Sequence, residues 1–199
     1  GKETSARLHP DGVRVVFARE RFNDDPDSRE LYVSTIDSSA AELRLTINSS
    51  RDDEPCWSPD GDLVLFTREI DGSSSLWTCS DSGQDEQPFL PTPTGAADGQ
   101  ADWSKTTNRV VFSRRDSIGQ HTLWLVNGSG FGEIPLTDAG AAVGPGNGDL
   151  QPTFSPDGQT IAFVRRFSEQ TATLCVADTT SGAVTTLYAA SAQVGYPRF

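Results

Sequence analysis

Pro55-Cys56-Trp57-Ser58-Pro59-Asp60-Gly61 decides the fold of this chain, because this stretch recurs along the sequence. It returns almost intact as Pro152-Thr153-Phe154-Ser155-Pro156-Asp157-Gly158, and a degenerate copy, Leu8-His9-Pro10-Asp11-Gly12, lies near the start. A further copy, Asp102-Trp103-Ser104, keeps the aromatic residue and loses the Pro-Asp-Gly. A motif that returns at intervals through a whole chain indicates a repeat architecture.

The spacing of the copies identifies the repeating unit. The anchor positions are separated by 49, 46, 51 and 45 residues, and they are Leu8, Trp57, Trp103, Phe154 and Phe199. Each interval has the length of one propeller blade, which is a small sheet of four strands.

Each anchor is followed by apolar segments in the same order. These segments are rich in β-branched and aromatic residues, which favours strands. Pro-Asp-Gly suits a tight turn that folds a first strand back onto a second. Pro88 and Pro135 restrict the fourth strand to a sheet edge, because proline cannot donate to a ladder on both sides. The expected second strands are 15–19, 64–68, 110–114 and 161–165, the third strands 31–33, 76–78, 123–125 and 174–176, and the outer strands 43–46, 87–90, 134–137 and 184–187.

The sequence therefore predicts an all-β fold, a β-propeller with four four-stranded antiparallel blades, in which no amphipathic helix of useful length can be drawn. The expected blades are residues 8–54, 55–100, 101–151 and 152–196. Residues 197–199 either start a next blade or form a strap that closes a ring.

The string Trp57-Ser58-Pro59-Asp60-Gly61, followed by a strand ending in Phe66 and then by Leu76-Trp77, resembles the repeat of TolB-like, WD-type six-bladed propellers. The same repeat occurs in propellers of prolyl-oligopeptidase-like and tricorn-like peptidases. The resemblance covers residues 8–199, and it implies a periplasmic or extracellular protein. Because such propellers have six or seven blades, we expect an excerpt from a longer propeller. A closed four-blade ring, or an open arc that pairs with a second copy, are the alternatives.

The composition of the chain excludes some classes of binding partner. The net charge is −12, from 28 acidic and 16 basic residues, which repels phosphate backbones and excludes nucleic acid as a partner. No apolar stretch has the length of a membrane span, so membrane insertion is not expected. The polar residues 1–4 form no targeting segment, and we expect a trimmed piece. Cys56, Cys79 and Cys175 match neither a disulfide framework nor a zinc site, and we interpret them as small buried hydrophobes.

A repeated polar pattern precedes three anchors and marks the candidate site. An aspartate lies five residues before each of these anchors, and a glutamate or glutamine lies three before, giving Asp52, Glu54, Asp98, Gln100, Asp149 and Gln151. Loops from an outer strand to the next inner strand surround the channel of a propeller, so these side chains are expected to form a partial ring at its mouth. Such a ring suits Ca²⁺, which takes six to eight oxygens, or a basic peptide. The alternative is that each acid only caps its loop.

Four arginines close the second strands in the same context, and they are Arg19, Arg68, Arg114 and Arg165. We expect them to pair with these acids or with neighbouring glutamates and so to hold the blades together. A ring of guanidinium groups that grips carboxylates of a ligand is the alternative.

The sequence carries little that indicates an enzyme. His9 and His121 are its two histidines, and no Gly-x-Ser-x-Gly occurs, so neither a catalytic triad nor a histidine metal cluster is expected. The leading interpretation is a noncatalytic module that binds a protein, a peptide or a cation at the acidic channel face. The alternatives are a propeller that gates a peptidase and a glycosidase-like propeller that uses a pair of carboxylates.

Overall fold

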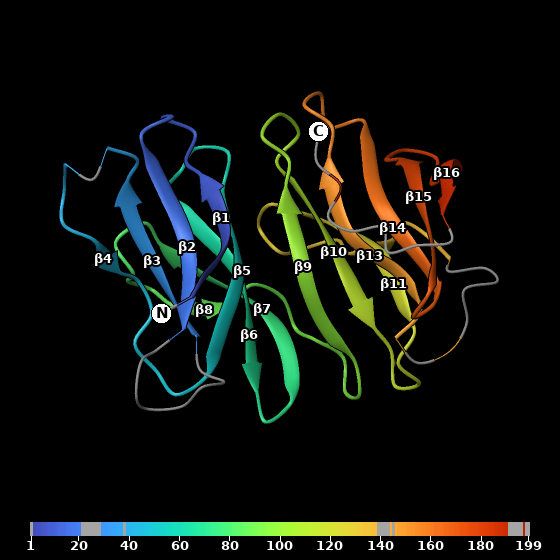
Figure 1. The fold of residues 1–199 in the computed structure, drawn as a ribbon, viewed down its shortest axis with the longest axis horizontal. Helices are drawn as coiled ribbons and strands as arrows, with labels where there is room; N and C mark the ends of the chain where they lie inside the picture. Colours follow the sequence, from blue (N-terminus) through green and yellow to red (C-terminus); the bar gives the residue numbers. More distant parts are fainter. Residues whose placement is uncertain are drawn as a thin grey trace. The chain divides into compact units, whose positions relative to one another are not determined.

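The computed structural model describes residues 2–20, 29–37, 39–138, 144, 146–190 and 197. Within these residues all regular structure is β, with sixteen strands and no helix (Figure 1). No segment of the described chain is therefore a helix that could span a membrane. The strands are β1 Glu3–Leu8, β2 Arg14–Glu20, β3 Arg29–Thr35, β4 Leu43–Arg44, β5 Arg51–Trp57, β6 Leu63–Ile70, β7 Ser73–Ser80, β8 Gln87–Pro88, β9 Ala97–Trp103, β10 Arg109–Arg115, β11 His121–Asn127, β12 Ile134–Pro135, β13 Gly148–Phe154, β14 Thr160–Ser168, β15 Thr171–Asp178 and β16 Val184–Ala190.

The strands form four antiparallel blades of four strands each, which confirms the predicted fold class. In every blade, consecutive strands are neighbours in the sheet, from β1–β4 to β13–β16. The innermost strands begin at Glu3, Arg51, Ala97 and Gly148, and the anchor position lies at or near the end of each. A single parallel bridge between His121 and Gly148 joins the last two blades into one eight-stranded sheet. Residues 191–196, 198 and 199, which belong to the expected last blade and strap, lie outside the described residues.

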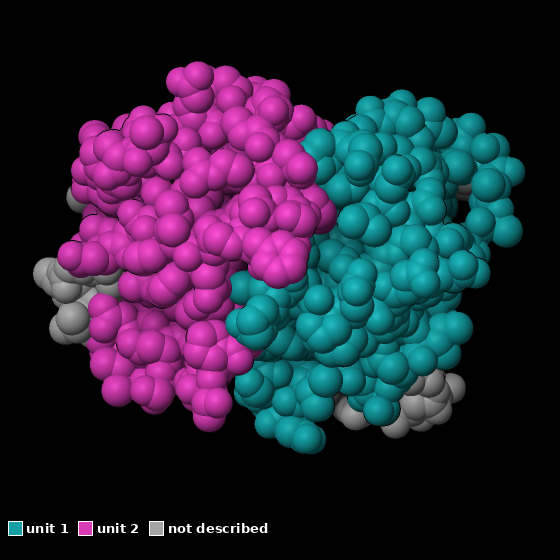
Figure 2. Space-filling view, turned by 180° about the vertical axis from the view of Figure 1, so that it is seen from behind, with its two compact units in different colours: residues 1–91 teal, residues 92–199 magenta. Residues whose placement is uncertain are grey.

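The chain divides into two compact units, coloured in Figure 2. Unit 1, Gly1–Pro91, holds the first two blades, and unit 2, Thr92–Phe199, holds the last two.

The Ser-Pro-Asp-Gly motif closes the turn between the first and second strands of a blade. Ser58 Oγ donates to Asp60 Oδ1 at 2.5 Å, and the same hydroxyl oxygen accepts Leu63 N–H at 3.0 Å. Gly61 has φ of +84°, a value that favours glycine. Ser155, Asp157 and Gly158 repeat the arrangement in the last blade. The recurring motif is therefore a recurring turn.

The core of each unit lies between the faces of its two blades. The second strand of each blade is buried at its centre, and Phe66, Phe112 and Phe163 have no exposed surface. In unit 1, Phe66 packs in one cluster with the anchor Trp57 and with third-strand residues such as Leu31. Burial on both faces explains why these strands are continuously apolar instead of alternating.

The buried cysteines give a direct chemical test of the core. All three are thiols that form no disulfide, and at most 3% of the surface of each is exposed. Burial, assisted by the nearby carboxylates of Glu86 and Asp52, raises the pKa of Cys79 to about 12, so its reactive thiolate is scarce at neutral pH. We expect no reaction of the native protein with Ellman's reagent at pH 8 and three reactive thiols after denaturation. Rapid labelling of a cysteine in the native state would contradict this packing.

Candidate functional site

The six predicted site residues lie on three innermost strands. Asp52 and Glu54 are in β5, Asp98 and Gln100 are in β9, and Asp149 and Gln151 are in β13. They were expected in the loops before these strands. They lie within the strands because each innermost strand starts pairing with its neighbour several residues before the anchor.

The three aspartates are fully buried in ion pairs with the repeated arginines. Each carboxylate accepts two hydrogen bonds from one guanidinium, at 2.7 and 2.7 Å for Asp52 with Arg68 and at 2.6 and 2.8 Å for Asp98 with Arg114. Asp149 accepts from Arg165 in the same way, at 2.7 and 2.8 Å. The predicted pairing with these acids is confirmed for Arg68, Arg114 and Arg165, but each pair joins two strands of one blade and does not link neighbouring blades. A ligand can contact these carboxylates directly only if the ion pairs open.

Each guanidinium group of the second and third blades has three further partners, two aromatic rings and one glutamate. The guanidinium of Arg68 lies over the rings of Phe66 and Trp77, with its Cζ atom 5.2 and 4.6 Å from their centroids, and Nη2 also donates to Glu86 at 2.6 Å. Arg114 repeats this with Phe112, Trp124 and Glu133. Burial opposes the charge of Arg68, but the hydrogen bonds and charge of Asp52 outweigh it, so the pKa of this guanidinium is raised.

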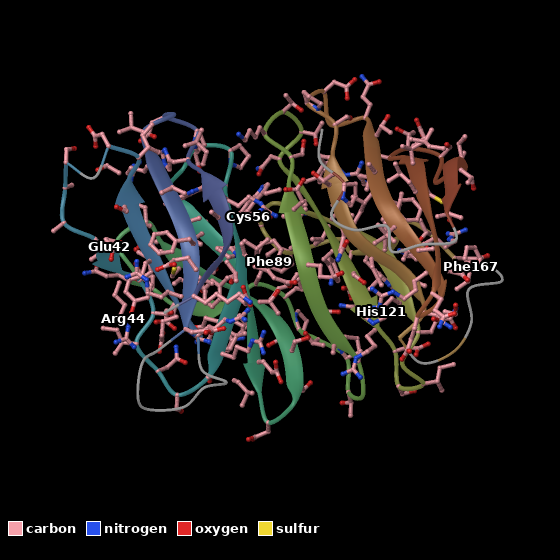
Figure 3. All side chains as sticks on the ribbon, in the orientation of Figure 1. Glu42, Arg44, Cys56, Phe89, His121 and Phe167 are labelled. Carbon is pink, nitrogen blue, oxygen red and sulfur yellow. The ribbon has the colours of Figure 1, made fainter. Side chains whose placement is uncertain are left out.

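We call each of these arginines with its acidic and aromatic partners an arginine box. We did not predict from the sequence that Glu86 and Glu133 belong to such boxes. Glu86 and Glu133 each lie one residue before a two-residue outer strand that ends in proline, so their shared position was the available signal. In the first blade, Arg19 donates to Glu42 at 2.7 and 2.9 Å and to Glu3 at 2.9 Å, and among the described residues no buried aspartate accepts from it. Glu42, directly before β4, is labelled in Figure 3. In the last blade, the backbone oxygen of Asp138 accepts from Arg165 at 3.0 Å, where the two middle blades use a glutamate.

The other three site residues occupy a strained backbone position that repeats. Glu54, Gln100 and Gln151 have φ of 55°, 54° and 55°, and Ser5 has 56° at the equivalent place in the first blade. The pairing with the second strand shifts register at each of these places. They are therefore β-bulges with a left-handed residue, a conformation that non-glycine residues rarely adopt. Strained backbone conformations are often found at functional sites. Because this one recurs on four innermost strands, its side chains are candidates for contacts with a ligand. We call Glu54 of unit 1 and Gln100 and Gln151 of unit 2 the bulge row, a name that refers to their equivalent places in the repeat.

Within each unit, the bulge of one blade is hydrogen-bonded to the bulge of the next. In unit 2, Gln100 Oε1 accepts the backbone N–H of Gln151 at 2.9 Å. In unit 1, Ser5 Oγ donates at 3.1 Å to Asp53 Oδ1, which also accepts Glu54 N–H at 2.8 Å. Thr67 Oγ donates to Glu54 Oε2 at 3.0 Å. All three side chains of the bulge row are partly exposed, and each carries an oxygen that accepts hydrogen bonds.

We searched the described residues for metal-ligand clusters and for histidines placed for acid–base chemistry. No group of three or more histidine, cysteine or acidic side chains is arranged there to hold a metal ion. His9 is buried in its turn, where Nδ1 accepts Asp11 N–H at 2.9 Å. His121 lies 3.0 Å from Ser113 Oγ at the junction of two blades. Both histidines are thus engaged in structural contacts.

Comparison with known proteins places the chain among propellers. It is 29% identical over 149 residues to an uncharacterised protein of Agrobacterium fabrum, an alignment that covers 69% of this chain and 47% of that protein. The crystal structure of TolB from Acinetobacter baumannii matches with a TM-score of 0.74 at 20% identity, over 94% of this chain and 44% of that one. A puromycin-hydrolyzing peptidase of Mycobacterium tuberculosis matches with a TM-score of 0.73 at 15% identity, over 95% of this chain and 29% of that one. The two structural matches show the fold alone.

The chain spans about half the length of the first relative that it matches, and less than a third of the peptidase. A family model described as TolB beta propeller domain matches residues 1–197, which is nearly the whole sequence. The chain therefore belongs to the TolB beta propeller domain family.

Proposed function

We propose that this propeller is a noncatalytic module that binds a protein or peptide partner through the bulge row. The single observation that supports this most is the left-handed residue repeated on the innermost strands, which redirects Glu54, Gln100 and Gln151 at equal positions of their blades. Asp52, Asp98 and Asp149 complete the proposed site as buried charges that fix the strands carrying the row.

The chemistry of the row favours a partner segment rich in hydrogen-bond donors. One carboxylate and two carboxamides offer oxygen acceptors, and the chain carries a net charge of −12. A basic peptide segment supplies both N–H donors and the complementary charge. Ca²⁺ fits less well, because the three aspartate carboxylates already accept paired hydrogen bonds from arginines.

Resemblance to TolB supports a periplasmic or extracellular location for this module. A second candidate function is an accessory propeller of a peptidase, favoured by the match to the mycobacterial peptidase. In that case the catalytic residues would belong to a part of the protein outside this chain, and the bulge row would meet peptide substrates on their way to them.

A peptide selection tests the proposed function. A display library of short random peptides is selected on the wild-type chain, and the affinity of the enriched peptides is measured by fluorescence anisotropy. The test variant combines Glu54→Gly, Gln100→Gly and Gln151→Gly, because glycine keeps the left-handed backbone while removing the side chains. We expect basic peptides to be enriched and the variant to lose at least about tenfold in affinity, the size of effect typical for interface anchors.

The matched control carries Glu69→Ala, Gln87→Ala and Gln159→Ala, which removes the same side-chain types at exposed positions. This control should bind like the wild type, and melting midpoints should show that both variants are folded. Failure to enrich any peptide, or equal binding by the two triple variants, would refute the proposal. A melting midpoint that rises with Ca²⁺ alone and falls with chelator would favour a cation in its place.

A further inference from the structure

The two blades of unit 2 meet along a seam formed by β13 and residues 146–147 directly before it. Gly146 N–H donates to Gly119 O at 2.7 Å, and His121 N–H donates to Asn147 O at 2.9 Å. Further along the seam lie the bond from Gln151 N–H to Gln100 and a bond of 2.8 Å from Phe154 N–H to Asp102 Oδ2. The seam is thus closed mainly by neutral backbone groups.

Besides the carboxylates of Asp102 and Asp149, this seam contains the imidazole of His121. Ser113 Oγ donates its single proton to the backbone oxygen of Asp149 at 2.9 Å, so it can only accept from His121 Nδ1, 3.0 Å away. The neutral imidazole therefore carries its proton on Nδ1 and leaves Nε2 free of a proton. A second proton added at Nε2 would keep the hydrogen bond and add a positive charge.

That charge would meet an unfavourable environment. Arg115 is the direct cross-strand partner of His121 in β10, and Arg166 in β14 is the partner of Gly148, which is bridged to His121. Burial and, to a smaller extent, the charges of Arg115 and Arg166 lower the pKa of His121 to about 4, and the carboxylate of Asp116 opposes this shift. The carboxylate of Asp149, also at the seam, is held by Arg165.

We propose that His121 is an acid-sensitive lock of this seam, which holds the two blades of unit 2 together while neutral and opens the seam locally when protonated. This inference concerns the seam and does not depend on what the bulge row binds. The ordinary pKa of histidine, 6.5, lies above the value in the closed seam, so the open form binds more protons between about pH 4 and 6.5. The contribution of His121 to closure is complete above pH 6.5 and is lost as the pH falls through this window.

These two pKa values imply that the ratio of open to closed seam rises by about 30-fold between pH 7.5 and 5.0. Hydrogen–deuterium exchange measures this ratio at the amides of β13, after correction for the intrinsic effect of pH. Strand β5 of unit 1 serves as the internal reference, because the blade before it carries Arg29 at the place where the blade before β13 carries His121. We expect β13 to lose protection relative to β5 in the wild type and to lose much less in a His121→Gln variant.

His9→Gln is the matched control, because it removes the other histidine of the chain and should leave the response of β13 intact. It also leaves a single imidazole, whose titration by NMR reads the pKa of His121 directly in a chain with the wild-type seam. An imidazole that titrates near 6.5, or equal loss of protection in wild type and His121→Gln, would overturn the proposal. If the His121→Gln variant does not fold, the NMR titration alone decides.

Discussion

Asp98→Ala is expected to lower the free energy of unfolding by about 3–5 kcal/mol, the cost typical of removing one partner from a buried ion pair. Asp98 has no exposed surface, and the guanidinium of Arg114 is only 6% exposed. The variant leaves this cation buried with Glu133 as its remaining carboxylate, which is 35% exposed and contacts one nitrogen at 3.0 Å. Urea unfolding followed by tryptophan fluorescence measures the loss.

Two companion variants separate the cost of an unpaired charge from the value of the pair. Glu133→Ala removes the more exposed partner and should cost no more than about 1 kcal/mol. The double variant Asp98→Leu/Arg114→Met replaces both charges by apolar groups and should recover much of the stability that Asp98→Ala loses. Equal losses for Asp98→Ala and Glu133→Ala would show that the buried pair carries no special weight.

The fold could be predicted from the sequence because the signals that specify it are local and repeated. Ser58 and Asp60 form within the turn the hydrogen bonds that their types predict, and the same residues recur nearly a hundred positions later at Ser155 and Asp157. The second strands, such as 64–68, fall within observed strands because an apolar run flanked by turns has few other solutions. The ion pairs followed from the matched repeats of acid and arginine.

The site was predicted only in outline, because its decisive features depend on backbone geometry and on contacts between distant segments. Nothing in the residue types of Glu54 or Gln100 requires a left-handed backbone, which arises from a shift in pairing with the next strand. The aspartates are buried while the residues of the bulge row are partly exposed, and this difference depends on the pleat of the strand and on the shift in pairing. His121 has the sequence pattern of an ordinary strand residue, and its bridge partner Gly148 lies 27 positions away.

The four arginine boxes also show why the blades tolerate variation. The buried aspartate of the middle blades is absent from the first blade, where Arg19 stacks on Tyr32 and pairs with Glu3 of β1 and with Glu42, directly before β4. In the last blade, Cys175 stands in the register place of Trp77 and Trp124. The constant element is a guanidinium held against the second-strand phenylalanine, so this contact defines the repeat more closely than any one acid does.

Gly148→Ala is expected to cost at least about 3 kcal/mol, because it combines backbone strain with a steric clash at the seam of unit 2. Gly148 has φ of +108°, and a Cβ atom there would lie 2.1 Å from the backbone oxygen of His121. That oxygen belongs to a paired strand and cannot rotate away as a side-chain end would. Thermal and urea unfolding give the loss in stability.

Gly72→Ala provides the matched control for the strain alone. Gly72 has φ of +77°, and a Cβ atom there would meet nothing within 4 Å. Its substitution should cost roughly 1–2 kcal/mol, the ordinary penalty of a left-handed alanine. The difference between the two variants therefore measures how rigidly the parallel bridge at His121 fixes the approach of β13. If Gly148→Ala cost no more than Gly72→Ala, the seam would have to yield by more than an ångström without loss, and the tight blade-to-blade contact inferred here would be wrong.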